Sequence, residues 1–245
     1  MGCGASSPYK GVQVLQVRDS PGKELEGKLV QVVGRVGHAG ELLESPWTFK
    51  QGTAIKIITA IPSGGPGGGA HRTLFTACCI KPFNIYDGGE YVQVNVENQN
   101  AWQLNLKKTD DIFNIYRDAK DPDMMHSGGN KPGLTTEAQP RPNAMQFWKD
   151  FHGGKDDPFN MTALNGKGMS GFGNRPRMAT EKLLLPGDLV SVLGILAQTT
   201  SGYSLNEGPG AAVTNLPSLA PALKSCTAKE GSEAKAAEIY PMKPS

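Results

Sequence analysis

The sequence lacks the residues that build a metal centre or a disulfide framework. Its four cysteines, Cys3, Cys78, Cys79 and Cys226, show no C-x-x-C spacing, so neither structural zinc nor a cystine scaffold is indicated. No apolar run approaches the roughly 18–20 residues of a transmembrane helix, and the N-terminus has no secretory signal stretch. We therefore expect no metal and no cofactor in a reduced chain that faces the cytosol.

The sequence also lacks an excess of positive or negative charge. The chain has 25 Lys and Arg against 23 Asp and Glu, a formal net charge of +2, and no block of five or six like charges. Aromatic side chains on small barrels can stack on bases, but an alternating strand buries roughly half of them and the basic footprint is missing. We expect no nucleic acid. The aromatic residues concerned are Trp47, Phe49, Phe75, Phe83, Tyr86, Tyr91 and Trp102.

The most informative motif is the N-terminal hexapeptide Met1-Gly2-Cys3-Gly4-Ala5-Ser6. It fits the pattern M-G-x-x-x-[ST], in which Gly2 is myristoylated after Met1 is removed. Cys3 lies beside it, where palmitate could be added, and two acyl chains hold a protein on a membrane stably whereas one does not. The alternative is a chance match of a small-residue N-terminus. The hexapeptide predicts lipidation of Gly2 and Cys3 and attachment to the cytosolic face of a membrane.

The rest of the chain has the pattern of short strands. Because 31 of 245 residues are Gly and 18 are Pro, many turns are expected. Residues 1–27 form a polar lead-in in which Val12, Val14 and Val17 could add an edge strand; residues 28–224 form one β-rich domain; residues 225–245 form a flexible tail. Strands are predicted at 29–36, 54–61, 72–80, 101–106, 112–116, 189–196 and 203–205, with a hairpin at 83–96 turning at Asp87-Gly88 and a helical turn within 216–223.

Periodicity disappears between about 118 and 177, and we interpret this stretch as an irregular insertion. A loop of this length is functional or disordered. It contains one amphipathic island at 144–151, whose aromatic residues Phe147, Trp148 and Phe151 form a weak candidate site for a protein partner. The alternative is that these rings cover the end of the barrel.

Two segments together resemble the GIDE-type domain, the β-rich region of MULAN-like membrane E3 ubiquitin ligases. The first is Val32-Val33-Gly34-Arg35-Val36 followed by Glu41-Leu42-Leu43-Glu44-Ser45-Pro46, where proline favours a turn. The second is Thr180-Glu181 followed by Leu185-Pro186-Gly187-Asp188-Leu189-Val190-Ser191-Val192-Leu193-Gly194, and the 83–94 hairpin resembles the middle of the domain. The resemblance covers about 28–116 and 178–220. It implies an OB-like small β-barrel, in which Pro186-Gly187-Asp188 shapes a turn and Gly194 permits close packing or a bulge.

Departures from that family limit what the resemblance implies. Nothing after Gly194 supplies the clustered Cys and His ligands of a RING finger, because Cys226 stands alone and the last histidine is His152. The transmembrane helices of the family are missing, and Thr53-Ala54-Ile55 replaces its usual cysteine. The resemblance therefore implies the domain without ligase activity.

No constellation of catalytic residues is visible in the sequence. The four histidines (His38, His71, His126, His152) lie in Gly-rich or irregular segments without a motif such as H-E-x-x-H. Adjacent Cys78 and Cys79 must point to opposite faces of a strand, one as a core residue and one outward. The pairs Asp110-Asp111 and Asp156-Asp157 match no EF-hand loop and are interpreted as solvated acidic turns. We expect that the chain is not an enzyme.

These observations favour a mainly β protein, an OB-like small β-barrel of the GIDE type with a long irregular insertion and flexible termini. The function they predict is a membrane-tethered, non-catalytic protein-binding adaptor or structural module. The alternative is the RING-less partner- or substrate-binding subunit of an E3 ubiquitin ligase assembly. A third hypothesis, an enzyme of unrecognised type, would require a deep pocket with converging polar groups.

Overall fold

The fold is mainly β and contains a closed five-stranded barrel. The computed structural model describes residues 11–37, 40–62, 71–117, 125–127, 139–140, 144, 177–200, 202–224 and 226. Within these ranges the helical segments are 3-10 turns, η1 (Lys23–Leu25), η2 (Gln99–Ala101) and η3 (Pro221–Lys224), apart from a single helical residue, Ala144. The predicted fold class is confirmed: a small β-barrel built from short, β-branched strands.

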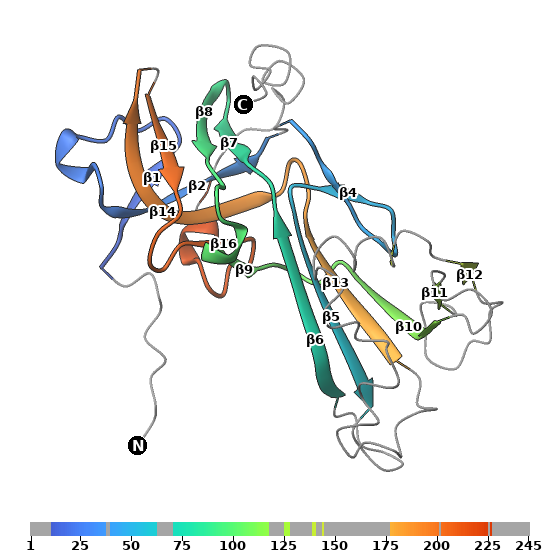
Figure 1. The fold of residues 1–245 in the computed structure, drawn as a ribbon. Helices are drawn as coiled ribbons and strands as arrows, with labels where there is room; N and C mark the ends of the chain where they lie inside the picture. The colour runs from blue at the N-terminus through green and yellow to red at the C-terminus, as the bar shows by residue number, and fades with distance from the viewer. Residues whose placement is uncertain are drawn as a thin grey trace, which may run out of the picture.

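The sheet closes into a barrel because an additional pairing, between β2 and β14, joins the two ends of a five-strand run (Figure 1). β2 pairs with β7 and also with β14, antiparallel in both cases. The ring is completed by the antiparallel pairs β7–β8 and β14–β15 and by the parallel pair β8–β15. This five-stranded Greek-key order is that of an OB-like barrel. The five strands are β2 (Leu29–Val36), β7 (Phe83–Asp87), β8 (Glu90–Val94), β14 (Leu189–Thr199) and β15 (Gly202–Asn206).

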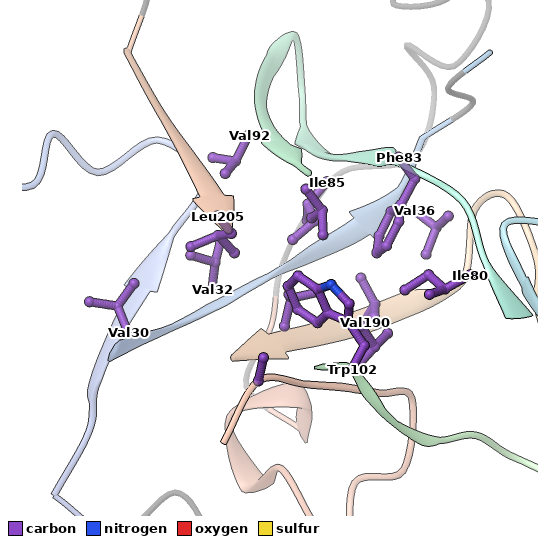
Figure 2. Packing of buried hydrophobic residues seen from close by; sticks show 14 of the residues in the cluster. Val30, Val32, Val36, Ile80, Phe83, Ile85, Val92, Trp102, Val190 and Leu205 are labelled. Carbon is purple, nitrogen blue, oxygen red and sulfur yellow. The ribbon is translucent and has the colours of Figure 1, made fainter. Parts of the chain in front are cut away.

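The interior of the barrel is filled by branched and aromatic side chains. Figure 2 shows these side chains gathered between the strands, with Trp102 joining residues of the ring. Burying one such side chain contributes roughly 1.5–3 kcal/mol to stability. Fully buried members of this cluster include Val30, Val32, Val36, Phe83, Ile85, Val92, Val94, Val190, Val192 and Leu205.

Three short strands extend the barrel sheet. β1 (Gln13–Gln16) pairs in parallel with β2, and β9 (Gln103–Asn105) pairs in parallel with β16 (Ala212–Thr214), which pairs with β14. The edge strand expected in the lead-in is therefore present. Of the valines named for it, Val17 is buried just after the strand and Val14 is 43% exposed, while Leu15 is the buried residue of the strand itself. The barrel sheet and its core therefore include part of the lead-in.

A second sheet of six strands lies beside the barrel and was not predicted as a separate unit. Figure 1 shows its long strands β5, β6 and β13 running side by side away from the barrel. β13 is central, since it pairs with both β5 and β10. In order across the sheet the strands are β12 (Gln139–Pro140), β11 (Met125–Ser127), β10 (Asp110–Arg117), β13 (Arg177–Leu184), β5 (Ala54–Pro62) and β6 (His71–Ile80). Strands β11 and β12 lie within the predicted insertion, which is thus not wholly irregular.

One face of the second sheet carries its own core. Residues directly opposite on paired strands point to the same side, so Ile55 and Ile57 of β5 share a face with Leu183 and Ala179 of β13. Trp47 packs on this face together with Ile112, Ile115, Ala77 and Ala144. A two-stranded hairpin, β3 (Leu43–Glu44) with β4 (Gln51–Gly52), carries Trp47 in its loop.

The predicted hairpin at 83–96 is present, but its turn lies one residue later than the predicted Asp87-Gly88, whereas the glycine of the late strand packs closely as predicted. The turn between β7 and β8 has its two positive φ angles at Gly88 (60°) and Gly89 (114°), so Asp87 is the last strand residue. A Cβ on Gly194 would lie 3.0 Å from the Asn206 carbonyl oxygen and 3.3 Å from the Trp102 ring. Gly194 therefore serves close packing. The predicted helical turn within 216–223 corresponds to η3, slightly later in the chain.

Candidate functional site

The most unusual polar group in the described part of the chain is the carboxylate of Glu181. Glu181 is fully buried at the middle of β13, opposite Ile57 of β5 and Asp110 of β10. Removing a carboxylate from water is costly unless hydrogen bonds replace its hydration. The surroundings of Glu181 must therefore supply donors.

The donors all come from the loop of the β3–β4 hairpin. The backbone N–H of Trp47 donates to Glu181 Oε1 at 2.9 Å, and the Thr48 hydroxyl donates to Oε2 at 2.7 Å. The Ser45 hydroxyl also donates to Oε1, in a short hydrogen bond. Hydrogen bonds to a charged acceptor are the stronger kind. Glu181 of β13 thus binds three donor groups of one turn, those of Ser45, Trp47 and Thr48.

Residues 45–50, here called the 45–50 turn, form a hydrogen-bonded turn in which Phe49 has a left-handed backbone. The N–H of Phe49 donates to the Ser45 carbonyl at 3.1 Å, and the N–H of Ser45 donates to the Lys50 carbonyl at 2.8 Å. The Ser45 hydroxyl oxygen accepts the Thr48 N–H at 3.2 Å, as an N-cap side chain does. Phe49 has φ 57°, a position normally taken by Gly or Asn. The predicted turn at Ser45-Pro46-Trp47 is confirmed.

The segment after β13 is hydrogen-bonded to the end of β2. The Gly187 N–H donates to the Val36 carbonyl at 2.7 Å, the Val36 N–H donates to the Asp188 carbonyl at 2.9 Å, and Arg35 donates to the Gly187 carbonyl at 2.9 Å. The Asp188 carboxylate accepts the Leu185 N–H at 3.0 Å. Gly187 has φ 85°, as the predicted turn requires. The 32–46 and 180–194 segments therefore meet twice, at Glu181 and at this turn.

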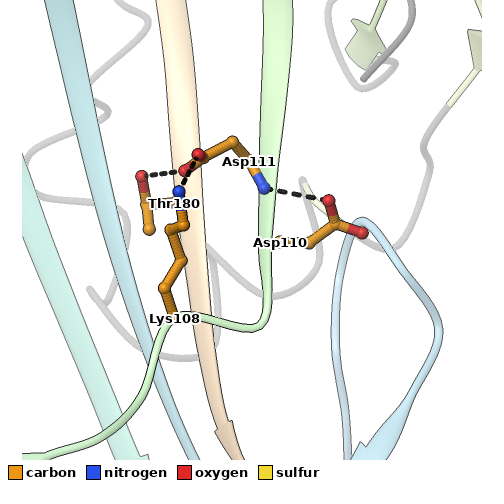
Figure 3. A network of polar contacts seen from close by, with 4 residues as sticks. All are labelled: Lys108, Asp110, Asp111 and Thr180. Atoms are coloured by element: carbon orange, nitrogen blue, oxygen red, sulfur yellow. Dashed lines mark hydrogen bonds and ion pairs between the residues drawn. The ribbon is translucent and has the colours of Figure 1, made fainter. Parts of the chain in front are cut away.

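A second polar network fixes β10 against β13 (Figure 3). Asp111 accepts the Lys108 ammonium at 2.6 Å and the Thr180 hydroxyl at 2.7 Å, and Asp110 accepts the Asp111 N–H at 2.9 Å. The nearby Asp111 carboxylate raises the pKa of the Lys108 side chain. The interpretation of Asp110-Asp111 as a solvated acidic turn is wrong, because both residues begin β10 and bond within the sheet. Asp156 and Asp157 lie outside the described residues.

The two adjacent thiols, those of Cys78 and Cys79, are packed into the protein. Cys79 is buried, and Cys78 is half-buried against the barrel core. Burial raises the pKa of both thiols, that of Cys79 to about 11. A raised pKa removes the thiolate that nucleophilic or redox chemistry needs. From the sequence, the outward-facing cysteine could have been acylated or redox-active. In the structure neither thiol has the lowered pKa that such reactivity requires.

Slow alkylation of Cys79 is the expected consequence. With a pKa near 11 instead of 9, its thiolate population at pH 8 falls about 100-fold. A pulse of iodoacetamide on the native full chain, read by peptide mass spectrometry, should label Cys79 about 100-fold more slowly than the same chain in 8 M urea. Equal rates in the native and unfolded chains would contradict the assignment.

The candidate site residues chosen from the sequence lie outside the described residues. This holds for the lipidation sites Gly2 and Cys3 and for the aromatic residues Phe147, Trp148 and Phe151, as well as for His38 and His152. Of the aromatic side chains considered for base stacking, Trp47, Phe83, Tyr86 and Trp102 are buried, Tyr91 is half-buried and Phe49 is 42% exposed.

The described ranges offer neither a metal-binding cluster nor a membrane-spanning helix. No group of three or more His, Cys, Asp or Glu side chains there is placed to hold a metal ion. No helix among those residues has the length and apolar character needed to cross a bilayer.

Sequence reasoning missed Glu181 as a site residue and Phe49 as an exposed one. A signal for Glu181 was present: it occupies the same strand phase as Ala179 and Leu183, two buried residues at spacing two. An acidic residue on the apolar phase of a strand indicates a specific partner for that carboxylate. Phe49 gave no comparable signal, because nothing in its neighbours shows that its backbone is left-handed.

Comparison with known proteins gave no match: no family model, no curated protein and no solved structure is similar to this chain.

Proposed function

We propose that this chain is a membrane-tethered, non-catalytic protein-binding adaptor, held on the cytosolic face of a membrane by myristate on Gly2 and palmitate on Cys3. The non-catalytic part of the proposal is supported by the hydrogen bonding of the Glu181 carboxylate. This carboxylate, the buried acid of the described residues, has its oxygens occupied by three donors of the 45–50 turn. It serves to shape a surface rather than to transfer a proton.

The filled barrel and the neutral thiols support the same proposal. Apolar side chains from all five strands occupy the barrel interior, and burial keeps Cys78 and Cys79 protonated. A rigid β scaffold with an immobilised turn suits recognition of another protein. The acyl anchor is supported by the N-terminal hexapeptide.

Metabolic labelling tests the anchor. Cells expressing the full chain with its native N-terminus are fed alkyne-myristate, and we expect Gly2→Ala to abolish label and to move the chain from the membrane to the soluble fraction. Gly4→Ala is the matched control, since Gly4 is not the acceptor residue, and it should behave as wild type. Cys3→Ser should keep myristate but weaken membrane retention, because one chain binds only marginally. Equal labelling of wild type and Gly2→Ala, or of neither, would contradict the anchor.

A second candidate function is a RING-less partner- or substrate-binding subunit of an E3 ubiquitin ligase assembly, with the GIDE-type domain as the basis. It is favoured by the position of the two segments that carry the resemblance. The 32–46 and 180–194 segments that carry the resemblance contact each other through Ser45 and Glu181 and through Val36 and Gly187, so they form one structural motif. Isolation of the chain from membranes with a RING-finger protein would favour this candidate over the general adaptor.

A further inference from the structure

The lead-in strand β1 is fixed to the barrel, although it lies close to the proposed acyl anchor in the sequence. Its residues Gln13–Gln16 pair in parallel with β2. Leu15 and Val17 are both 4% exposed and belong to the barrel core. The Tyr203 hydroxyl donates to the Gln16 carbonyl at 3.2 Å. The start of β1 therefore has a defined place on the barrel.

The segment between the proposed acyl group and this strand is short. Gly11, the first described residue, is exposed, and a Cβ there would meet nothing within 4 Å. It lies nine residues after Gly2, and a chain of that length spans at most about 30 Å in any conformation. An acyl chain on Gly2 that is inserted in a bilayer thus holds the start of β1 within about 30 Å of the headgroups.

An apolar strip lies at this end of the barrel sheet. Leu15 points into the barrel core, so its neighbour Val14 points outward, because successive residues of a strand face opposite sides. Val14 is 43% exposed. Val12 packs with Leu29 of β2 in a small cluster separate from the barrel core, and both are half-buried. Val12, Val14 and Leu29, here called the β1 strip, form an apolar surface beside Gly11.

We propose that the β1 strip is the surface of the barrel that lies against the membrane, with its side chains in the boundary between headgroups and acyl chains of a phospholipid bilayer. The proposal rests on the acyl anchor and names the surface that the anchor brings to the membrane. The strip begins one residue after Gly11, so its contact with the bilayer is intramolecular once the anchor is inserted, and its effective concentration is high. Because a single myristoyl chain binds only marginally, this second apolar contact adds to retention.

The charges beside the strip favour apolar contact over attraction to anionic lipid. Lys28 and Glu26, both exposed, precede Leu29 in the chain. They carry one charge of each sign, so the attraction of an anionic surface for this end of the barrel is small. Membrane binding through buried apolar area does not require anionic lipid. We therefore expect the β1 strip to act on vesicles of phosphatidylcholine alone.

The first test measures membrane partitioning of a chain with one acyl group. The full chain carrying Cys3→Ser is co-expressed with N-myristoyltransferase, its myristate is verified by intact mass, and it is floated with phosphatidylcholine vesicles. Val14→Thr keeps a β-branched side chain and should lower the partition coefficient about 2–4-fold. Val14→Leu adds a methylene and should raise it by a similar factor.

The matched control makes the reverse change elsewhere. Thr76 is exposed on β6 of the second sheet, away from β1 in Figure 1, and Thr76→Val should leave the partition coefficient unchanged. The proposal would be overturned if neither Val14 variant changed partitioning, or if Thr76→Val raised it as much as Val14→Leu.

The second test locates the strip directly. A genetically encoded fluorescent residue is placed at position 14 or, as the control, at position 76 of the same myristoylated chain. The vesicles contain phosphatidylcholine that is spin-labelled on its acyl chain. We expect the spin label to quench position 14 strongly and position 76 weakly. Equal quenching at both positions, or none at position 14, would show that another surface faces the membrane.

Failure of the strip and failure of the anchor are distinguishable. A chain that carries myristate and floats, but is not quenched at position 14, keeps the anchor and overturns the strip. A chain that the transferase does not modify overturns both. Thermal unfolding checks the fold: Val14→Thr should stay within about 3 °C of the wild-type Tm. If it falls further, Val14→Leu and the quenching at position 14 decide the proposal.

Discussion

Replacing Glu181 by alanine is expected to lower the free energy of unfolding by about 3 kcal/mol, and Tm by about 6–12 °C. The change removes the acceptor of three hydrogen bonds and leaves the buried N–H of Trp47 without its carboxylate. Hydroxyl groups of Ser45 and Thr48 can rotate to each other, since their oxygens lie 2.9 Å apart, whereas a backbone N–H cannot. Equilibrium urea unfolding followed by tryptophan fluorescence measures the loss.

Two variants calibrate this result. Glu181→Gln keeps one carbonyl acceptor and should fall between wild type and alanine. Glu207 is the matched control: its carboxylate also accepts backbone N–H groups, those of Glu97 and Asn98, but it is not buried. Glu207→Ala should therefore cost no more than about 1 kcal/mol. Equal losses for Glu181→Ala and Glu207→Ala would mean that the buried carboxylate has no special structural role.

The second large effect is expected at Gly34, where alanine should destabilise the chain by about 3 kcal/mol. A Cβ there would lie 2.5 Å from Cγ2 of Ile85, 2.8 Å from Cγ2 of Val17 and 3.0 Å from the Tyr86 carbonyl oxygen. Gly34 is in the middle of β2, the strand that closes the barrel, so the surrounding atoms cannot move apart without disturbing the closing pair with Val190. Urea unfolding of Gly34→Ala measures the cost.

Gly22→Ala is the control for crowding by a movable neighbour. There the added Cβ would meet only the Glu24 carboxylate, the far end of an exposed side chain that can swing away. We expect this variant to be neutral or to gain up to about 1 kcal/mol from reduced freedom of the unfolded chain. If Gly34→Ala proved as stable as Gly22→Ala, the close packing of Gly34 against Val17, Ile85 and Tyr86 would be wrong.

Strands with β-branched alternation were predictable from the sequence almost to the residue. β2 has the expected bounds of 29–36, and β5, β6 and the β7–β8 hairpin differ from expectation by one or two residues at their ends. These strands are flanked by Gly, Pro and Asp, so their local signals are strong. By contrast the strand signal of β13 is weak, because the charged residue Glu181 stands between Ala179 and Leu183 on its apolar phase. Its conformation is imposed by pairing with β5 and β10.

The division into a barrel and a second sheet could not be predicted, because it depends on pairing between distant strands. Val32 of β2 lies opposite Val192 of β14, 160 residues later, and either strand alone would satisfy many partners. The same holds for the candidate site. The turn at Ser45-Pro46 was visible locally, but its contact with Glu181 and the left-handed backbone of Phe49 arise only once β13 lies beneath it.

The central proposal is that an acyl anchor on Gly2 holds this chain on a membrane. The most direct measurement compares the membrane-bound fractions of wild type, Gly2→Ala and the matched control Gly4→Ala, each expressed with its native N-terminus. We expect Gly2→Ala to move to the soluble fraction and Gly4→Ala to stay on the membrane with wild type. The account would be contradicted if all three chains were distributed alike.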